Sequence, residues 1–519
     1  MAKLIQHSAA NVASLPAPVG GWNARDSIAN MAPADAVTLE NFFPTVSSVV
    51  LRGGYTKYAT GLGGQVQTLM SYSGGATNKL FAAAATTLSF YDVSASGAVG
   101  AAVVSGLTNA IWEWVNVTIS NTHYLYCVNG ADKPQLYDGA TWTAIDSAST
   151  PAITGVTTTK LDNITLFKNR IWFIEKNTLR AWYLPTSSVG GAAQVLDLSS
   201  IARFGGHLVD LDTWTLDAGY GVDDNLVFIT SKGEVIVYRG TDPSSASTWA
   251  LSGVWKLGSP IGKRCFLKYA GDLLVLTYDG LLPLAAGLQS SRLDPRVALS
   301  NKIQGAITEA TTAYGGDHAA VGWQIVYNAK NNAVMVNVPV ADDQQQQYVM
   351  NTITQSWCKF TGWGAYCWGE YKDDGYFGGN GFVGKAWTST YKDDTANITT
   401  NALQAFNYFE QRGVQKYFTR CRPNLFTDGN PAIFVGVNTD YNVTNSSSAL
   451  SYSPSSVGLW DTGLWDASYW ASGLQITNNW QGVTGIGYAA AVQLKSASSG
   501  LQIEWASTDV VFQAGWQGI

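Results

Sequence analysis

Charged residues are scarce in this sequence. Asp, Glu, Lys and Arg make up 13% of its 519 residues, about half the share found in a typical globular domain. The formal net charge is −6, so the chain has no overall basic character with which to neutralise phosphates. We therefore expect no sequence-specific nucleic-acid binding, and a surface of neutral polar residues such as occurs in chains that pack into large assemblies.

Cysteine and histidine are also rare. The five cysteines include no Cys-x-x-Cys pair, which favours reduced, buried thiols over a disulfide framework or a zinc site. The four histidines are scattered, and the best local group is His207 with Asp210 and Asp212. The common nucleotide-binding, hydrolase and metalloprotease motifs do not occur. We predict that the protein is not an enzyme, with no catalytic residues, no cofactor and no metal.

Long apolar runs are missing as well. The most apolar stretch, residues 273–288, is interrupted by Asp279, Gly280 and Pro283, and it falls short of the run of about 18 apolar residues that suggests a membrane span. The first residues, MAKLIQHSAANVAS, do not form the apolar segment of a signal peptide. We expect a chain made in the cytoplasm, with no membrane-spanning segment.

Short runs of β-branched and aromatic residues between Gly, Asn, Asp and Pro dominate the sequence. Residues 124–145 show the unit, with turns predicted at Asn129-Gly130 and at Asp138-Gly139 and with Trp142 following. A similar pattern ends at Trp357. Self-similar four-stranded units predict an all-β chain with a β-propeller, of about six or seven blades, over residues 65–394. A long array of β-sandwiches is the alternative that the same pattern allows.

The two ends of the chain differ from this middle region. Residues 395–519 alternate apolar and polar residues as half-buried strands do, which predicts an additional C-terminal β-sandwich-like domain. It contains two GLWD repeats, and we predict exposed aromatic contacts at Trp460, Trp465 and Trp470, whereas most of the 20 tryptophans should be core. Residues 1–64 are rich in Pro and Gly and predict an irregular N-terminal docking arm with a short helix from Pro33 to Leu39.

Specific motifs at both ends carry a resemblance to a known family. The arm contains GGWNARDS at residues 20–27, then Leu39, Asn41, Phe43, Pro44 and an Arg52-Gly53 turn. The C-terminal region contains GLWDTGLWD, NNWQGVTGIGYAAAVQLK and LQIEWASTDVVFQAG. These segments resemble tail nozzle proteins, also called tail hub proteins, of short-tailed bacteriophages.

The resemblance implies a structural protein of the virion tail. Such a subunit forms a homo-hexamer below the portal and its adaptor ring, contacts tail fibre or tail tip proteins, and acts as a conduit and gate for DNA retention and ejection. It passes genomic DNA without sequence-specific binding. Within the arm, we expect Trp22, Asn23, Arg25 and Asp26 to bind a partner, or else to form a structural turn.

Two other functions stay open at this point. A propeller glycosidase or a Trp-based carbohydrate-binding protein would act on cell-surface sugars, and its tryptophans would serve as stacking surfaces. A receptor-binding tail protein would also lie in the virion tail. It would differ from the nozzle mainly in which end of the protein faces the host.

Overall fold

The computed structural model describes residues 10–217, 222–288, 295–315, 321–341, 344–429, 431–444 and 474–515. The chain forms two compact units. Unit 1 comprises Met1–Thr56, Tyr348–Gly362 and Trp387–Ile519, and unit 2 comprises Lys57–Gln347 and Trp363–Ala386. Unit 2 is therefore an insertion in the sequence of unit 1.

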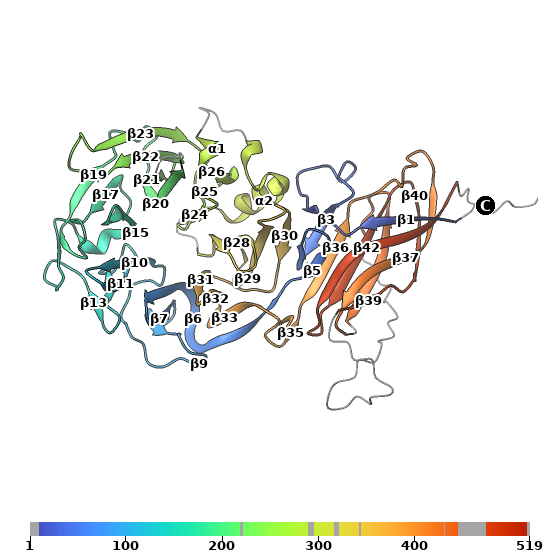
Figure 1. The fold of residues 1–519 in the computed structure, drawn as a ribbon, viewed down its shortest axis with the longest axis horizontal. Helices are drawn as coiled ribbons and strands as arrows, with labels where there is room; N and C mark the ends of the chain where they lie inside the picture. Colours follow the sequence, from blue (N-terminus) through green and yellow to red (C-terminus); the bar gives the residue numbers. More distant parts are fainter. Residues whose placement is uncertain are drawn as a thin grey trace, which may run out of the picture. The chain divides into compact units, whose positions relative to one another are not determined.

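Unit 2 is a β-propeller. Its described strands form groups of antiparallel strands, which we number as blades 1 to 7 in chain order, and Figure 1 shows that these blades are arranged around one axis. Three of these blades are complete four-stranded sheets. They are blade 2 with β10 (Glu113–Ile119), β11 (Thr122–Val128), β12 (Gln135–Tyr137) and β13 (Trp142–Ala144); blade 3 with β15 (Leu161–Phe167), β16 (Arg170–Glu175), β17 (Arg180–Tyr183) and β19 (Gln194–Asp197); and blade 4 with β20 (Leu208–Asp217), β21 (Val222–Thr230), β22 (Glu234–Gly240) and β23 (Trp249–Lys256).

The other blades are shorter or continue into further strands, as blade 6 does through the pairing of β29 with β30 (Trp357–Phe360). They are blade 1 with β6 (Gly54–Gly74), β7 (Thr77–Ala84) and β8 (Ser89–Asp92); blade 5 with β24 (Phe266–Tyr269), β25 (Asp272–Thr277) and β26 (Gly280–Pro283); blade 6 with β27 (Gln324–Asn328), β28 (Ala333–Ala341) and β29 (Gln344–Asn351); and blade 7 with β31 (Cys367–Tyr371), β32 (Asp374–Gly378) and β33 (Asn380–Thr388). Strand β6 pairs with both β7 and β33. The ring is thus closed by strands from opposite ends of the propeller sequence, which leaves fewer free sheet edges.

The turns of blade 2 show how the sequence specifies these sheets. Gly130 and Gly139 have φ values of 66° and 99°, in the region that glycine adopts without steric cost. The Asp138 carboxylate accepts hydrogen bonds from the backbone N–H groups of Ala140 and Thr141. Trp142 then packs edge-on to Phe81 at 5.0 Å. A polar turn followed by an aromatic core residue is therefore the local unit, as the sequence predicts.

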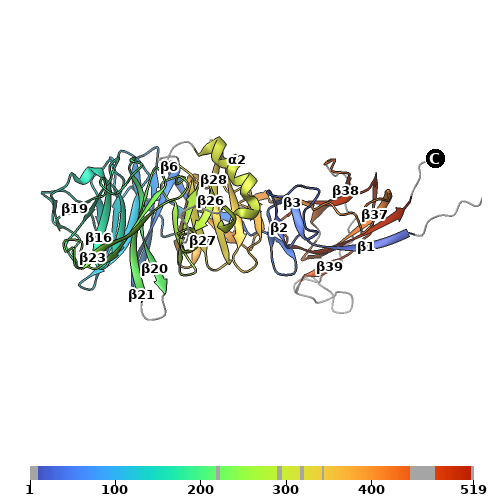
Figure 2. The same cartoon turned by 90° about the horizontal axis from the view of Figure 1, so that it is seen from above.

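A few small elements complete unit 2. The helices are α1 (Leu284–Gly287) and α2 (Gln304–Tyr314), with 3₁₀ turns η1 (Thr158–Lys160), η2 (Pro295–Val297) and η3 (Asn301–Ile303). Helix α2 packs against β26 and β28 (Figure 2). The short strand β9 (Gly97–Ala98) pairs with β6, and β14 (Ile153–Thr154) and β18 (Gly191–Ala192) form a separate two-stranded sheet. No helix in the described part of the chain is both long and apolar enough to cross a membrane.

Unit 1 is built from two sheets that contact each other through β38 with β37 and β36 with β4. The first sheet holds β1 (Ala10–Pro16), β4 (Phe42–Pro44), β5 (Val49–Leu51), β37 (Lys416–Thr427), β39 (Gln475–Thr477), β40 (Gln481–Gly487) and β42 (Ile503–Ala514). The second holds β2 (Gly21–Trp22), β3 (Asp35–Glu40), β30 (Trp357–Phe360), β36 (Thr399–Gln404), β38 (Ala432–Thr439) and β41 (Ala490–Ala497). Strands β34 (Lys392–Asp393) and β35 (Ala396–Asn397) form a small hairpin beside Tyr55.

The N-terminal segment is part of this sandwich, which corrects the expected irregular arm. Ala10–Pro16 pairs with Gln513–Ser507 along β42, and β3 pairs with β36. The short helix expected after Pro33 is strand β3. Ala36 and Leu39 are both fully buried, and two buried residues three positions apart are typical of a helix. Here a bulge between Ala36 and Thr38 gives the same spacing within a strand.

The division into units also differs from the expected domains 1–64, 65–394 and 395–519. Residues 348–362 and 387–394 belong to the sandwich unit although they lie in the expected propeller range, and the first 56 residues join the C-terminal strands. The expected burial of thiols is confirmed, since all five cysteines are free and buried. The expected burial of tryptophans holds for Trp112, Trp172, Trp357, Trp363 and Trp505, which are among the largest fully buried side chains.

Candidate functional site

The four arm residues singled out in the sequence lie together in one turn of unit 1. Asn23 is 1% exposed. Its Nδ2 donates to Asp26 at 2.9 Å and to Asp35 at 2.8 Å, and its Oδ1 accepts from the backbone N–H groups of Arg25 and Asp26. One buried amide thereby satisfies four polar groups, which fixes the turn.

Gly21 and Trp22, which precede Asn23, pack this turn against the strand that begins at Trp357. Gly21 has φ of 82°, and a Cβ there would lie 2.6 Å from the backbone oxygen of Trp357, so no other residue fits without strain. Trp22 packs edge-on to Tyr348 at 5.3 Å. The Lys359 ammonium lies 5.8 Å from the Trp22 ring centre. Trp22 is therefore a packing residue of unit 1 and is only partly accessible.

Arg25 is the member of this group that is most open to solvent. Its guanidinium forms two hydrogen bonds with the neighbouring Asp26 carboxylate, at 2.8 and 3.0 Å. The side chains of Arg25 and Asp26 are 45% and 35% exposed. A partner that met this turn would therefore meet the Arg25–Asp26 pair, while Asn23 would act from beneath as a positioning residue.

The second part of the arm motif forms a buried ion pair. The Arg52 side chain is fully buried, and it bonds the Asp393 carboxylate at 2.9 and 2.6 Å. The remaining donors reach Asn41 Oδ1 at 2.8 Å and the backbone oxygens of Gly53 and Thr361. The bidentate geometry uses all the guanidinium donors, as buried arginine requires.

Asn41 and Phe43 extend this cluster. Asn41 Nδ2 donates to Thr361 Oγ1 and to the Thr399 backbone oxygen, both at 2.8 Å. Phe43 packs against Phe360 and Trp387, at 6.2 and 5.7 Å between ring centres. The cluster therefore joins the three chain segments that make up unit 1. Its residues hold the fold together and present no reactive group.

Other residues considered from the sequence are not assembled into a catalytic group. Trp460, Trp465 and Trp470 lie outside the described residues. Asp210 is buried, accepts a hydrogen bond from Asn163 Nδ2 at 2.8 Å, and lies 3.6 Å from Cys265 Sγ. Burial, together with the charges of Glu113 and Asp212, raises the pKa of Asp210 well above its usual range. His207 instead lines a separate pocket of about 250 Å³ with Asp162 and Lys263.

A groove with a volume of about 970 Å³ lies on blade 4 of the propeller. It runs from Ala285 and Leu288 at α1, across the outer strands of blade 4, to Lys168 at a turn of blade 3. Blade 5 contributes three strands within the described residues, one fewer than blade 4. The groove is lined on the blade 5 side by Ala285 and Leu288.

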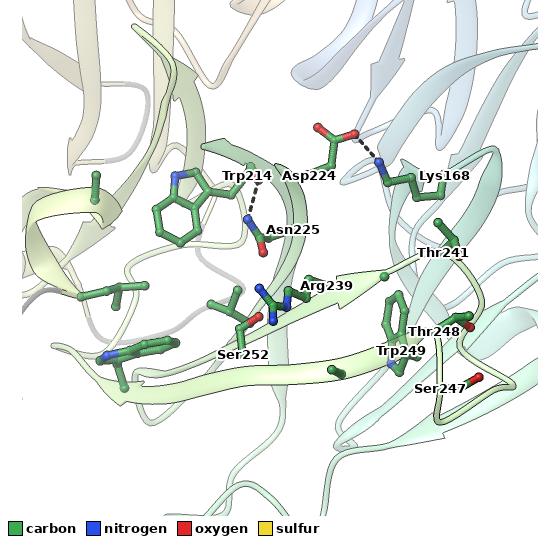
Figure 3. Close-up of a pocket in the computed structure, with 16 residues that line it drawn as sticks. Lys168, Trp214, Asp224, Asn225, Arg239, Thr241, Ser247, Thr248, Trp249 and Ser252 are labelled. Carbon is green, nitrogen blue, oxygen red and sulfur yellow. Dashed lines mark hydrogen bonds and ion pairs between the residues drawn. The ribbon is translucent and has the colours of Figure 1, made fainter. Parts of the chain in front are cut away.

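The groove combines tryptophans, hydroxyl groups and cations (Figure 3). Arg239 lies between Trp214, Ser252 and Trp249 in this view, and the Lys168–Asp224 ion pair, 2.7 Å long, lies beyond them. A hydrogen bond from Lys168 lowers the pKa of Asp224, so that this carboxylate stays ionised and paired. Arg239 is exposed, and none of the described residues forms an ion pair or hydrogen bond with its guanidinium.

No sequence motif predicted this groove. Trp214, Arg239 and Trp255 lie on different strands, and no motif connects them. Runs of β-branched residues predicted the strands, but only the three-dimensional arrangement of blades 4 and 5 shows which side chains remain uncovered.

Comparison with known proteins identifies no family for this chain. No known family profile matches the chain, and no curated protein sequence is significantly similar to it. Among solved structures, the chain is similar to the Cps50 (Swd1) β-propeller domain of Myceliophteria thermophila, with 14% identity, a TM-score of 0.40, and coverage of 64% of this chain and 99% of that one. It is also similar to YCF48 bound to D1 peptide, with 11% identity, a TM-score of 0.34, and coverage of 65% and 94%.

A third similar structure is the extracellular domain of the putative hybrid two component system BT3049 from B. thetaiotaomicron, with 12% identity and a TM-score of 0.38. The match covers 62% of this chain and 40% of that chain. The class of the chain follows from its own strand topology: unit 2 is a β-propeller and unit 1 is an additional β-sandwich, so the chain is an all-β protein.

Proposed function

We propose that this chain is a non-enzymatic subunit of the tail nozzle, or tail hub, of a short-tailed bacteriophage. In this role it forms a hexameric ring below the portal and adaptor in the virion and serves as a conduit and gate for DNA. The proposal starts from the sequence motifs at the two ends of the chain, which resemble this family.

One observation carries the proposal further. The arm motif is far apart in sequence from the two described C-terminal segments, residues 478–495 and 501–515, and all of them belong to one compact unit. Val49 of β5, between Pro44 and Arg52 of the arm motif, pairs with Trp505 of β42, and β3, which contains Leu39, lies in one sheet with β41 through β36. A resemblance confined to segments that fold together is what a shared attachment domain predicts, with a propeller inserted into it that varies among relatives.

The charge of the chain suits a conduit. A protein that lines a DNA path with many Lys and Arg residues would bind phosphates and slow the passage of DNA. This chain has 31 basic and 37 acidic residues. A neutral-to-acidic channel surface repels the DNA backbone weakly and leaves it free to move.

The exposed Arg25–Asp26 pair is the part of the arm motif that we assign to a partner contact. Deletion of the whole arm would remove strands β1 to β5 and unfold the sandwich, so a point substitution is the sharper test. Arg25→Glu reverses the exposed charge while Asn23 keeps its hydrogen bonds to Asp35 and to the turn backbone. We expect the wild-type chain to co-sediment with the portal–adaptor complex encoded beside it, and Arg25→Glu to lose affinity by about tenfold or more.

Arg203→Glu is the matched control, since it makes the same charge change at an exposed residue of unit 2. It should co-sediment like the wild-type chain. A wild-type chain that stays monomeric and ignores the ring would contradict the nozzle assignment and favour a propeller glycosidase or a receptor-binding protein. Equal binding by Arg25→Glu and wild type would refute only the role of Arg25.

A further inference from the structure

The groove on blade 4 is positioned on a rigid part of the propeller. Trp249 is stacked between Trp172 and Tyr238, with ring centres 5.5 and 5.3 Å apart and nearly parallel planes. Trp214 Nε1 donates to Asp272 at 2.8 Å, and the same carboxylate accepts from the backbone N–H of Ala285 in α1. Both walls of the groove are thus fixed before any ligand arrives, which lowers the entropy cost of binding.

Trp255 has one ring face on the protein and is partly exposed to solvent. A Cβ at Gly253 would lie 2.4 Å from the Trp255 ring, which shows that the indole folds back over the glycine. The neighbouring Ser252 is the extra residue of a β-bulge, because Val237 pairs with Gly253 while Tyr238 pairs with Leu251. Bulges often redirect side chains at binding sites. Here the bulge and the glycine together place the flat ring of Trp255 at the groove.

The open floor of the groove holds one uncompensated cation. Asn225, Arg239 and Ala250 are register partners across β21, β22 and β23, so their side chains share one face of the sheet. Ala250 leaves the space above that row open. Lys168 and Asp224 neutralise each other, and Arg239 has no carboxylate partner among the residues that the structure describes. The fixed charge of the groove is therefore +1.

Hydroxyl-bearing side chains line the rest of the groove, namely Thr241, Ser247, Thr248 and Ser252. The Trp249 Nε1 in the wall is buried and has no hydrogen-bond partner in the described structure, and such unpaired donors occur where water or a ligand completes the site. The volume of about 970 Å³ is at the upper end of the usual range for ligand pockets, about 300–1,000 Å³.

We propose that this groove binds a carboxylate-bearing oligosaccharide. The C–H face of a sugar ring stacks on the electron-rich face of Trp255, the sugar hydroxyls exchange hydrogen bonds with the Ser and Thr side chains, and the Arg239 guanidinium forms a bidentate pair with one sugar carboxylate. A single free cation fits one carboxylate per ligand. It does not fit a nucleic acid, whose backbone needs a row of cations.

The test is isothermal titration calorimetry of the full chain with acidic oligosaccharides and their neutral counterparts. The probes are oligogalacturonate, hyaluronan, alginate and oligosialic acid fragments, each paired with its methyl ester, in which the carboxylate charge is removed. We expect at least one acidic probe to bind more tightly than about 1 mM and at least about tenfold more tightly than its ester. Failure of every acidic probe to bind at this level would overturn the proposal.

Three variants connect binding to the groove. Arg239→Gln should weaken binding of the acidic probe by at least about tenfold and leave binding of the ester unchanged. Gly253→Val should abolish stacking of the sugar by displacing the Trp255 ring. Trp255→Ala should reduce the affinity for the acidic probe to the same extent as Gly253→Val. Arg203→Gln, which removes an exposed cation elsewhere in unit 2, is the matched control and should bind like the wild type.

Folding of each variant is checked by thermal unfolding, so that loss of binding is separated from loss of structure. Binding that is insensitive to both Arg239→Gln and Gly253→Val in folded protein would overturn the assignment to this groove. Equal or tighter binding of a glutamate-rich peptide, or of an oligothymidine, at the same site would overturn the saccharide class. None of these outcomes depends on the nozzle assignment, since the groove lies within the propeller unit.

Discussion

Replacing Arg52 by alanine should destabilise unit 1 more than any other single change proposed for this protein. Arg52 is fully buried, and its partner Asp393 is 12% exposed. The substitution leaves the Asp393 carboxylate without its counter-ion and removes the donors to Asn41, Gly53 and Thr361. Breaking a buried pair by removing one partner costs about 3–5 kcal/mol of unfolding free energy.

This loss can be converted into a shift in melting temperature. Unit 1 holds about 200 residues, and for a domain of that size each kcal/mol changes Tm by about 2–4 °C. The unit 1 transition of Arg52→Ala should therefore move down by about 6–20 °C. Differential scanning calorimetry measures the shift, and hydrogen exchange of the peptides that contain Asn41 and Thr361 assigns the transition to unit 1.

Two variants act as controls. Arg25→Ala removes an exposed arginine from another ion pair of the same unit, and exposed pairs contribute only about 0–1 kcal/mol. The double variant Arg52→Met with Asp393→Leu removes both charges and should recover part of the loss. The cluster would not be what holds the segments of unit 1 together if the unfolding free energy of unit 1 in Arg52→Ala lay within about 1 kcal/mol of the wild-type value.

Three further predictions concern single residues. Asn23→Ala should lower the unfolding free energy of unit 1 by about 1–3 kcal/mol, because four polar groups lose one shared partner. Urea denaturation measures the change, and a value below about 0.5 kcal/mol would contradict this role. Gly21→Ala should lower it by about 1–3 kcal/mol, because the alanine Cβ would meet the Trp357 backbone at positive φ; unchanged stability would show that the turn can shift. In the propeller, burial and the charges of Glu113 and Asp212 raise the pKa of Asp210, so the folded chain keeps a proton that the unfolded chain loses above about pH 4. Wild-type stability should therefore fall relative to Asp210→Asn as the pH rises from about 4 towards 7, by at most about 1.4 kcal/mol per pH unit, and a pH-independent difference would contradict the shift.

The sequence predicted the fold class because the turn chemistry is local. Gly139 and the Asp138 side chain specify their hairpin with neighbours only two or three residues away. The blade count and the closure by β6 depend on pairing between residues far apart, such as Val66 with Gly379, which periodicity does not encode. The strand at Ala36–Leu39 resembled a helix because a bulge changes the two-residue period of a strand.

The candidate sites divide in the same way. Asn23, Arg25 and Asp26 could be predicted as one group because they form a turn within four residues. The sequence could not show that Asn23 is buried or that Arg52 pairs with Asp393, 341 residues further along the chain. Arg239 carries no sequence signal at all, since its significance comes from its place in the groove on blade 4.

Cryo-electron microscopy of the purified chain mixed with its own portal and adaptor proteins tests the central proposal most directly. The nozzle assignment predicts a six-fold ring with a central channel, attached to the adaptor, with the sandwich unit and its Arg25–Asp26 turn at the contact. A chain that remains monomeric, or a complex in which the turn faces solvent and the ring has no channel, would contradict the account.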